Sequence, residues 1–327
     1  MTATPRLGEF QRIARFFAPL AAPEALGLLD DVALIDGPPG EQYVLKTDAI
    51  VENVHFLPDD PPRQIAQKLL RVNLSDLAAK GARPYGYLLM TALRAGHDEA
   101  WLAEFAAGLA ADQKEFGIGL MGGDSVSTPG ATTLSVAALG RIKSGTAVLR
   151  RGAKPGETIY VSGTLGDAAL GLMVAKGGLS NMSPGARAFL LDRFRLPQPR
   201  LSLGPRLVGI ATAMMDISDG LVADLGHICD VSSVAAKVEA AKLPLSAAAR
   251  AALAGDASLR QAVLGGGDDY ELLFTAPAAA QAALATIAGE TGVAITAIGR
   301  IEAGQGVRVL DEAGRAMTVE TAGYAHF

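Results

Sequence analysis

The chain has 327 residues, which predicts two domains on the usual prior of roughly 150 residues each. Half of the residues are hydrophobic, enough for a sizeable core, and the net charge of −5 argues against a nucleic-acid-binding protein. No stretch approaches the roughly 20 apolar residues of a membrane span and the first residues do not form a signal peptide, so we expect a cytoplasmic protein without membrane contact. The single cysteine, Cys229, excludes an intramolecular disulfide, and its apolar neighbours favour a buried thiol.

The first half of the chain alternates predicted helices and strands. A short amphipathic helix over 7–17 precedes a strand over 28–35, and a second strand over 43–48 ends on Thr47 and Asp48. A strong helix over 61–81 carries polar residues, Asp76 among them, inside its apolar stripe. We expect a strand over 85–93, a helix over 97–116, a strand from 118 that runs into a turn at 122–125, and a strand over 132–139.

A shift of composition near residue 150, followed by a Pro-Gly turn, marks the predicted domain boundary. We therefore expect an N-terminal domain over 1–150 and a C-terminal domain over 151–327, both of α/β type. In the second domain we expect strands over 158–163, 210–215, 272–275 and 293–301, helices after 167, over 221–229 and over 277–288, and a terminal hairpin of 307–310 with 317–319.

The segment Asp216-Ile-Ser-Asp-Gly-Leu221 places two carboxylates, a hydroxyl and a glycine in one turn between a strand and a helix. Neighbouring carboxylates repel each other unless a cation lies between them, and Mg²⁺ prefers oxygen ligands that it often shares with phosphates. A helix N-terminus capped by Ser218 or Asp219 is an equally good interpretation. The turn alone does not decide between them.

Similar acidic positions recur along the chain at element ends or polar breaks, most of them beside Gly, Ser or Thr. They are Asp31, Asp48, Asp76, Asp124, Asp216, Asp219, Asp268 and Asp269. Several divalent ions in such a site would neutralise phosphates during phosphoryl transfer. The sequence has no P-loop, protein-kinase signature, zinc-type His/Cys cluster or G-x-S-x-G elbow, so an ATP-using activity would be of another type, and we assign no covalent nucleophile.

In their order and spacing, the motifs resemble the thiamine-monophosphate kinase family over essentially the full chain. The segments that carry the resemblance are Gly8-Glu-Phe10, Asp30-Asp31, Thr47-Asp48, Val54-His-Phe56, Val72-Asn-Leu-Ser-Asp-Leu-Ala-Ala79, Gly122-Gly-Asp124, Arg151-Gly-Ala-Lys-Pro-Gly156, Ser162-Gly-Thr-Leu-Gly-Asp167, Asp216-Ile-Ser-Asp-Gly-Leu221, Gly266-Gly-Asp-Asp-Tyr-Glu-Leu272 and Gly323-Tyr-x-His-Phe327.

This resemblance implies ATP-dependent phosphorylation of thiamine monophosphate to thiamine diphosphate, by direct in-line transfer with several Mg²⁺ ions. It also implies the two-domain α/β (α+β) fold shared with aminoimidazole ribonucleotide synthetase. In that fold the N-terminal domain would bind ATP and Mg²⁺ and form a homodimer through its sheet, and the C-terminal α/β domain would complete the site.

The resemblance also implies roles for individual residues. The metal ligands would be Asp31, Lys46 (through its carbonyl), Thr47, Asp48, Asp76, Asp124, Asp216 and Asp219. The ATP contacts would be Gly123, Asp124, Arg150 and Ser218, and the contacts to thiamine monophosphate His55, Asp268 and Tyr324. A carboxylate and an aromatic ring suit a ligand with a cationic thiazolium.

The chain departs from the family pattern at three positions. Leu29 stands where relatives commonly have a glycine, Lys46 where they usually have a serine, and Ala106 where many carry a tyrosine near the adenine. If the serine hydroxyl matters, one metal site is weakened at Lys46, or the ammonium stands in for an ion. Two alternatives stay open: another ATP-using enzyme of the same fold, such as a cyclo-ligase or selenophosphate synthetase, and a non-catalytic thiamine-phosphate or nucleotide binding protein.

Overall fold

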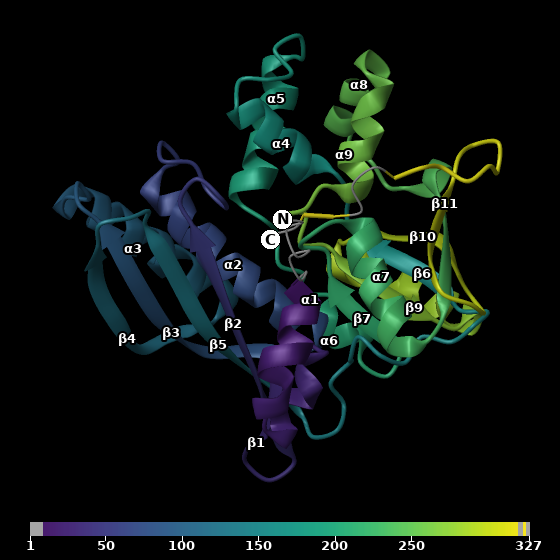
Figure 1. Cartoon of the computed structure of the whole chain (residues 1–327), viewed down its shortest axis with the longest axis horizontal. Helices are drawn as coiled ribbons and strands as arrows, with labels where there is room; N and C mark the ends of the chain where they lie inside the picture. The colour runs from purple at the N-terminus through teal and green to yellow at the C-terminus, as the bar shows by residue number, and fades with distance from the viewer. Residues whose placement is uncertain (1–8, 320–322, 325–327) are drawn as a thin grey trace, which may run out of the picture.

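The computed structural model describes residues 9–319 and 323–324. Two mixed α/β units lie side by side, each built on its own sheet, with helix α2 (Pro62–Ala79) running between them (Figure 1). Gly8 and residues 325–327, which belong to the terminal motifs of the sequence, lie outside the described part. Among the described residues, no helix combines the length and the apolar character needed to cross a membrane.

The N-terminal unit is a five-stranded sheet in the order β1-β2-β5-β3-β4. Its strands are β1 (Ala33–Asp36), β2 (Glu41–Val51), β3 (Arg83–Arg94), β4 (Gly119–Thr128) and β5 (Thr133–Lys143). Helices α2 and α3 (Glu99–Phe116) pack on one another and bury one face of the sheet in a shared core. Even-numbered positions of β2 such as Val44 and Ile50 face this core, and odd-numbered positions such as Thr47 face away.

The C-terminal unit is a six-stranded sheet in the order β11-β8-β10-β6-β9-β7. Its strands are β6 (Thr158–Ser162), β7 (Ala213–Asp216), β8 (Ala235–Glu239), β9 (Leu272–Ala276), β10 (Ile295–Glu302) and β11 (Gly306–Leu310). All pairs are antiparallel except β8 with β11.

Helices of the C-terminal unit cover its sheet and form a separate upper layer. Helix α7 (Leu221–Ser232) packs in one core cluster with β6 and β10, while α6 (Gly204–Leu207) and α10 (Gln281–Thr291) contribute to a second cluster. Helices α4 (Asp167–Ala175), α5 (Pro184–Arg195) and α8 (Ala247–Gly255) share a third cluster above the sheet, next to α9 (Arg260–Gly265) (Figure 1).

The structure corrects several of the predicted elements. Strand β2 continues through Asp48 to Val51, so Thr47 and Asp48 lie within the strand and not at its end. Likewise, β4 continues through 122–125, after a register shift against β3, where the sequence predicts a turn. The glycine at 123 is required by a close approach of backbones: a Cβ there would lie only 1.9 Å from the carbonyl oxygen of Leu89 on β3.

The two chain ends also differ from expectation. The predicted helix over 7–17 is, in its described part, an α-helical turn α1 (Glu9–Arg12) followed by a π-helical turn (Ile13–Phe17), and it buries none of its residues there. The predicted terminal hairpin is present in part: Leu310 forms an antiparallel bridge to Ala316, and the backbone N–H of Met317 donates to the Val309 carbonyl at 2.8 Å. Strand β11 also pairs in parallel with β8, which the sequence does not predict.

Helix α2 brings polar side chains to the boundary between the units. Asn73 and Ser75 are completely buried there, and both are partnered. Asn73 accepts the backbone N–H of Asp48 at 3.0 Å, and Ser75 donates to Asp216 on β7 at 2.5 Å. The polar break in the apolar stripe of α2 is therefore the place where both sheets are joined to one helix.

Candidate active site

A cavity of about 560 Å³ lies between the two units. Strand β2 and helix α2 line it from the N-terminal unit, and the turn after β7, helix α4 and the glycine-rich loop before β9 line it from the C-terminal unit. Most of the sequence-predicted site residues lie on its wall, namely Asp31, Lys46, Asp48, His55, Asp76, Asp216, Ser218, Asp219, Asp268 and Tyr324.

Lys46 lies at the acidic end of this cavity, which comprises Asp31, Asp48, Asp76, Asp216 and Asp219. Its Nζ lies 2.8 Å from Asp31 Oδ2 and 3.3 Å from carboxylate oxygens of both Asp48 and Asp76. Arg150 reaches the same Asp31 oxygen with its guanidinium, at 2.8 Å. The structure thus places two cationic side chains among the predicted metal ligands.

These cations act unequally on the carboxylates. Burial alone would raise the pKa of Asp31, but the ammonium of Lys46 and the guanidinium of Arg150 outweigh it and hold that pKa well below its usual range. Burial raises the pKa of both Asp48 and Asp76, and neighbouring carboxylates add to the shift, although Lys46 opposes it. The acidic end therefore carries more negative charge than its side-chain cations neutralise.

The turn 216–221 is shaped by a residue outside it. Asp224 Oδ2 accepts the backbone N–H groups of Ser218, Asp219 and Gly220 at 3.0, 3.1 and 3.1 Å. Gly220 is the N-cap of α7 and no side chain caps that helix, so the interpretation of Ser218 or Asp219 as a cap is wrong. Both residues instead line the cavity, where the backbone N–H of Tyr324 donates to the Asp219 carbonyl at 2.9 Å.

A buried lysine joins two of the predicted substrate contacts. Lys68 Nζ, on helix α2, donates to the Asp268 carboxylate at 2.9 Å and to the carbonyl of His55 at 2.8 Å. The Nδ1 atom of His55 accepts the backbone N–H of Val51 at 3.0 Å, so the neutral ring carries its proton on Nε2.

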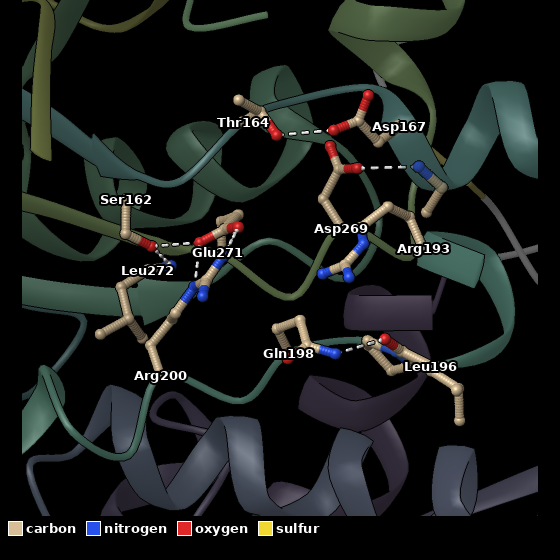
Figure 2. A network of polar contacts seen from close by, with 12 residues as sticks. Ser162, Thr164, Asp167, Arg193, Leu196, Gln198, Arg200, Asp269, Glu271 and Leu272 are labelled. Atoms are coloured by element: carbon tan, nitrogen blue, oxygen red, sulfur yellow. Dashed lines mark hydrogen bonds and ion pairs between the residues drawn. The ribbon is translucent and has the colours of Figure 1, made fainter. Parts of the chain in front are cut away.

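The loop that carries Asp268 is anchored by the residues that follow it (Figure 2). Asp269 accepts the backbone N–H of Gly166, just before helix α4, at 2.6 Å. Glu271 forms a bidentate ion pair with Arg200, in which one of the two bonds measures 2.6 Å. This network fixes the loop from the side away from the cavity, which leaves Asp268 oriented toward Lys68.

Four predicted site residues lie outside the cavity wall. Arg150 stands behind Asp31, and Thr47 points to the outer face of the sheet. Gly123 and Asp124 are exposed on β4. The strand register aligns Gly123 with Asp48 across the sheet, but β5 and β3 lie between them, so the two residues are about 14 Å apart at the usual strand spacing. Their proposed contacts to ATP and metal stay predictions.

The departures from the family pattern have different consequences. Leu29 has an ordinary φ of −104° and an exposed side chain, so its position does not require glycine. Ala106 is exposed on α3 and does not line the cavity. Lys46 is the departure that changes the site, because its ammonium lies among the acids.

Sequence reasoning missed several buried charged residues that support the site. Lys68 and Asp224 are among them, although a lysine inside an apolar stripe and an acid in the first turn of a helix are both recognisable signals. Asp30 accepts the backbone N–H of Arg150 at 2.6 Å, and Lys80 Nζ lies 3.7 Å from Asp30. Nothing in the local pattern distinguishes Lys80 from a solvated residue near a helix end.

The donor set at the acidic end fits Mg²⁺ bound together with phosphates. Its ligands are all oxygens, and five carboxylates face two cationic side chains there. Within residues 9–319 and 323–324, no three His, Cys, Asp or Glu side chains lie close enough together to hold an ion on their own. Mg²⁺ commonly takes one or two carboxylates and completes its shell with water and substrate phosphates.

Comparison with known proteins agrees with this geometry. The family model for the AIR synthase related protein N-terminal domain matches residues 29–142, and the model for the corresponding C-terminal domain matches residues 154–312. The chain is 41% identical to thiamine-monophosphate kinase from Caulobacter vibrioides over 323 residues, which cover 97% of this chain and 90% of the relative.

Solved structures extend the likeness to the fold. Thiamine-monophosphate kinase from Stenotrophomonas maltophilia superposes with a TM-score of 0.79 at 42% identity, covering 92% of this chain and 94% of the other. The structure of AaThiL complexed with AMPPCP and TMP gives a TM-score of 0.85 at 31% identity over the full length of both chains. The expected two-domain fold is confirmed, and the chain belongs to the thiamine-monophosphate kinase family.

Proposed function

We propose that this chain transfers the γ-phosphoryl group of ATP to the phosphate of thiamine monophosphate, giving thiamine diphosphate and ADP. One observation carries the proposal: a single cavity is lined both by acids suited to Mg²⁺ and phosphates and by His55, Asp268 and Tyr324. These two sets of residues match the phosphate and the cationic ring system of this substrate. The relative whose complex contains both an ATP analogue and TMP has this fold over its whole length.

At the acidic end, Asp48, Asp76, Asp216 and Asp219 would hold Mg²⁺ together with phosphate oxygens. Bound there, Mg²⁺ supplies neutralisation of the charge on the transferred group. The protein's own contribution is to hold these carboxylates in place, through Ser75 on Asp216 and through the turn that Asp224 fixes.

Asp268 and Tyr324 would bind the thiamine portion, with Lys68 keeping Asp268 in position. The proton on Nε2 of His55 gives a donor suited to a phosphate oxygen. Transfer would be direct and in line, and Cys229 is not a candidate nucleophile because it is buried and burial raises the pKa of its thiol to about 12. The presence of a single, free cysteine supports a cytoplasmic location.

We further propose a homodimer formed through the outer face of the N-terminal sheet. That face exposes Leu88 and Met90 on β3 and Val126 on β4, and among the described strands β4 is an unpaired edge. Gly123 and Asp124 do not line their own chain's cavity, so their role in binding ATP depends on such an assembly.

Incubation of the purified chain with Mg²⁺, ATP and thiamine monophosphate, followed by chromatography, tests the main proposal. We expect thiamine diphosphate and ADP in equal amounts, and no ADP when thiamine monophosphate is omitted. A folded protein that forms no thiamine diphosphate under these conditions contradicts the proposal.

A further inference from the structure

Lys46 is the buried cation nearest to the centre of the acidic end. Its side chain is 4% exposed, and its Nζ lies within ion-pair distance of Asp31, Asp48 and Asp76 at once. These three acids come from three different segments of the N-terminal unit, before β1, on β2 and on α2. Lys46 faces them because even-numbered positions of β2 point to the inner face of the sheet.

An ammonium in this place neutralises the surrounding carboxylates as a bound metal ion would. It is a compact point charge with three donors, and here three carboxylates surround it, which is the arrangement that makes a buried lysine tolerable. A divalent ion held by the same carboxylate oxygens would lie within a few ångströms of Nζ, where two positive charges repel each other strongly in a partly buried site. Lys46 and such an ion therefore exclude one another.

Other cations reinforce this division of the acidic end. Arg150 contacts Asp31 from the side opposite to the cavity, and Lys80 lies behind Asp30. In contrast, Asp216 accepts a hydrogen bond from Ser75, and no lysine or arginine of the described residues forms an ion pair with it. Among the described residues, the ion pairs formed by protein cations thus fall on Asp31, Asp48 and Asp76, while Asp216 interacts with Arg150 only at longer range.

We propose that the ammonium of Lys46 replaces one divalent cation between Asp31, Asp48 and Asp76, so that this chain binds one divalent ion fewer than a variant with a small neutral residue at position 46. The inference rests on the proposed function in one respect only, that the cavity binds divalent ions with a nucleotide. Residue 46 would thus set the number of divalent ions that the chain binds.

The test counts Mn²⁺ bound to the full chain by electron paramagnetic resonance, in the presence of the non-hydrolysable ATP analogue AMPPCP. The variant Lys46→Ser removes the ammonium and offers a hydroxyl, and we expect it to bind one more Mn²⁺ per chain than the wild type. Lys46→Arg keeps a cation and should match the wild type. Lys114→Ser, at an exposed position of α3, is the matched control and should also bind the wild-type number.

Equal Mn²⁺ counts in the wild type and Lys46→Ser would overturn the proposal. A second measurement uses Lys46→Met, which keeps the length of the side chain without its charge. With AMPPCP present, its melting temperature should rise on addition of Mn²⁺ by at least about 3 °C more than that of the wild type, because the uncompensated acids and the phosphates then bind the ion together. An equal rise in both proteins would overturn the proposal as well.

These readouts are independent of turnover. If the chain is an active kinase but the wild type and Lys46→Ser bind equal numbers of Mn²⁺, the proposed function is supported and this inference is wrong. If the chain has no kinase activity but Lys46→Ser binds one more Mn²⁺ than the wild type, the proposed function is wrong and this inference is supported.

Discussion

Ser75 Oγ, in the middle of helix α2, donates a 2.5 Å hydrogen bond to Oδ2 of Asp216 at the end of strand β7, although the two residues are 141 positions apart. Both are buried at the boundary between the units. The bond fixes a predicted metal ligand of the C-terminal unit to a helix of the N-terminal unit. The same hydrogen bond therefore joins the two units and positions a residue of the site.

The variant Ser75→Ala should affect stability and catalysis together. It leaves one oxygen of a buried carboxylate without its donor, which costs about 1–3 kcal/mol in the free energy of unfolding. We expect urea denaturation to show this loss and kcat/KM to fall as well. Ser180→Ala, at an exposed position, is the control and should stay within about 0.5 kcal/mol of the wild type. Indistinguishable effects of the two variants would show that the bond does not hold the site together.

The assignment of the acids predicts that Asp48→Asn and Asp216→Asn abolish turnover while the fold is kept. An amide removes the negative charge that a divalent ion needs but has nearly the same shape. Thiamine diphosphate formation and circular dichroism measure the two effects separately. Asp59→Asn, at an exposed position before α2, should keep full activity. Activity retained in both cavity variants means that the acids have another role.

Lys68 should matter for thiamine monophosphate more than for ATP. Replacing it by methionine removes the ammonium that orients Asp268, so the KM for thiamine monophosphate should rise roughly tenfold or more. The KM for ATP should change much less, since Lys68 bonds to Asp268 and His55, which are the predicted contacts to thiamine monophosphate. Steady-state kinetics with each substrate varied in turn makes the comparison, with Lys114→Met as the exposed control. A KM for ATP that rises by the same factor contradicts the position given to Lys68.

The burial of Lys80 predicts that the free energy of unfolding depends on pH. Burial lowers its pKa to about 8, with a further contribution from Arg150, and its Nζ makes no hydrogen bond within the described part of the chain. Because the unfolded state keeps the ordinary pKa near 10.5, it binds more protons than the folded state between these values. Stability should therefore rise as the pH increases from about 8 to 10.5, and the cost of the buried charge is fully present below pH 8.

The variant Lys80→Met isolates this effect. It should be more stable than the wild type at pH 7, by about 1–3 kcal/mol, and the difference should shrink as the pH approaches 10. Urea denaturation at a series of pH values measures both proteins under the same conditions. A constant difference across the series would mean that Lys80 does not titrate in this window.

The proposed dimer can be tested at the outer face of the N-terminal sheet. Leu88→Asp places a charge among exposed apolar side chains without touching the core, so we expect a monomer whose secondary structure is unchanged. Sedimentation velocity measures the mass of both proteins, and Leu102→Asp, on exposed α3, is the control. A wild type that sediments as a monomer contradicts the proposal.

The cavity acids could be predicted from the sequence because each lies next to an interpretable local pattern. Asp48 follows an apolar strand and Asp76 breaks an apolar stripe, and the likeness of the whole chain to one family supplied the rest. Strand and helix identities followed from periodicity, but strand ends did not: β2 and β4 both continue through residues that are typical of turns. Their extension depends on pairing with β5 and β3, which no local pattern contains.

The cations of the site could not be predicted in the same way. Lys46 and Lys80 lie in ordinary sequence surroundings, and although Lys68 interrupts an apolar stripe, only the tertiary structure shows that each of the three is buried against an aspartate from a distant segment. The sequence raised the possibility that Lys46 stands in for an ion, but the distances that support it depend on the packing of β2 against α2. The face of the sheet on which Asp124 lies could not be predicted either, since it follows from the register of β4 against β3.

The most direct test of the central claim follows the γ-phosphoryl group itself. The chain is incubated with Mg²⁺, thiamine monophosphate and ATP labelled with ³²P at the γ-position, and the products are separated by chromatography. We predict that the wild type moves the label into thiamine diphosphate and that Asp216→Asn leaves it in ATP. Label that stays in ATP, or appears only as inorganic phosphate, in reactions of the folded wild type would contradict the account.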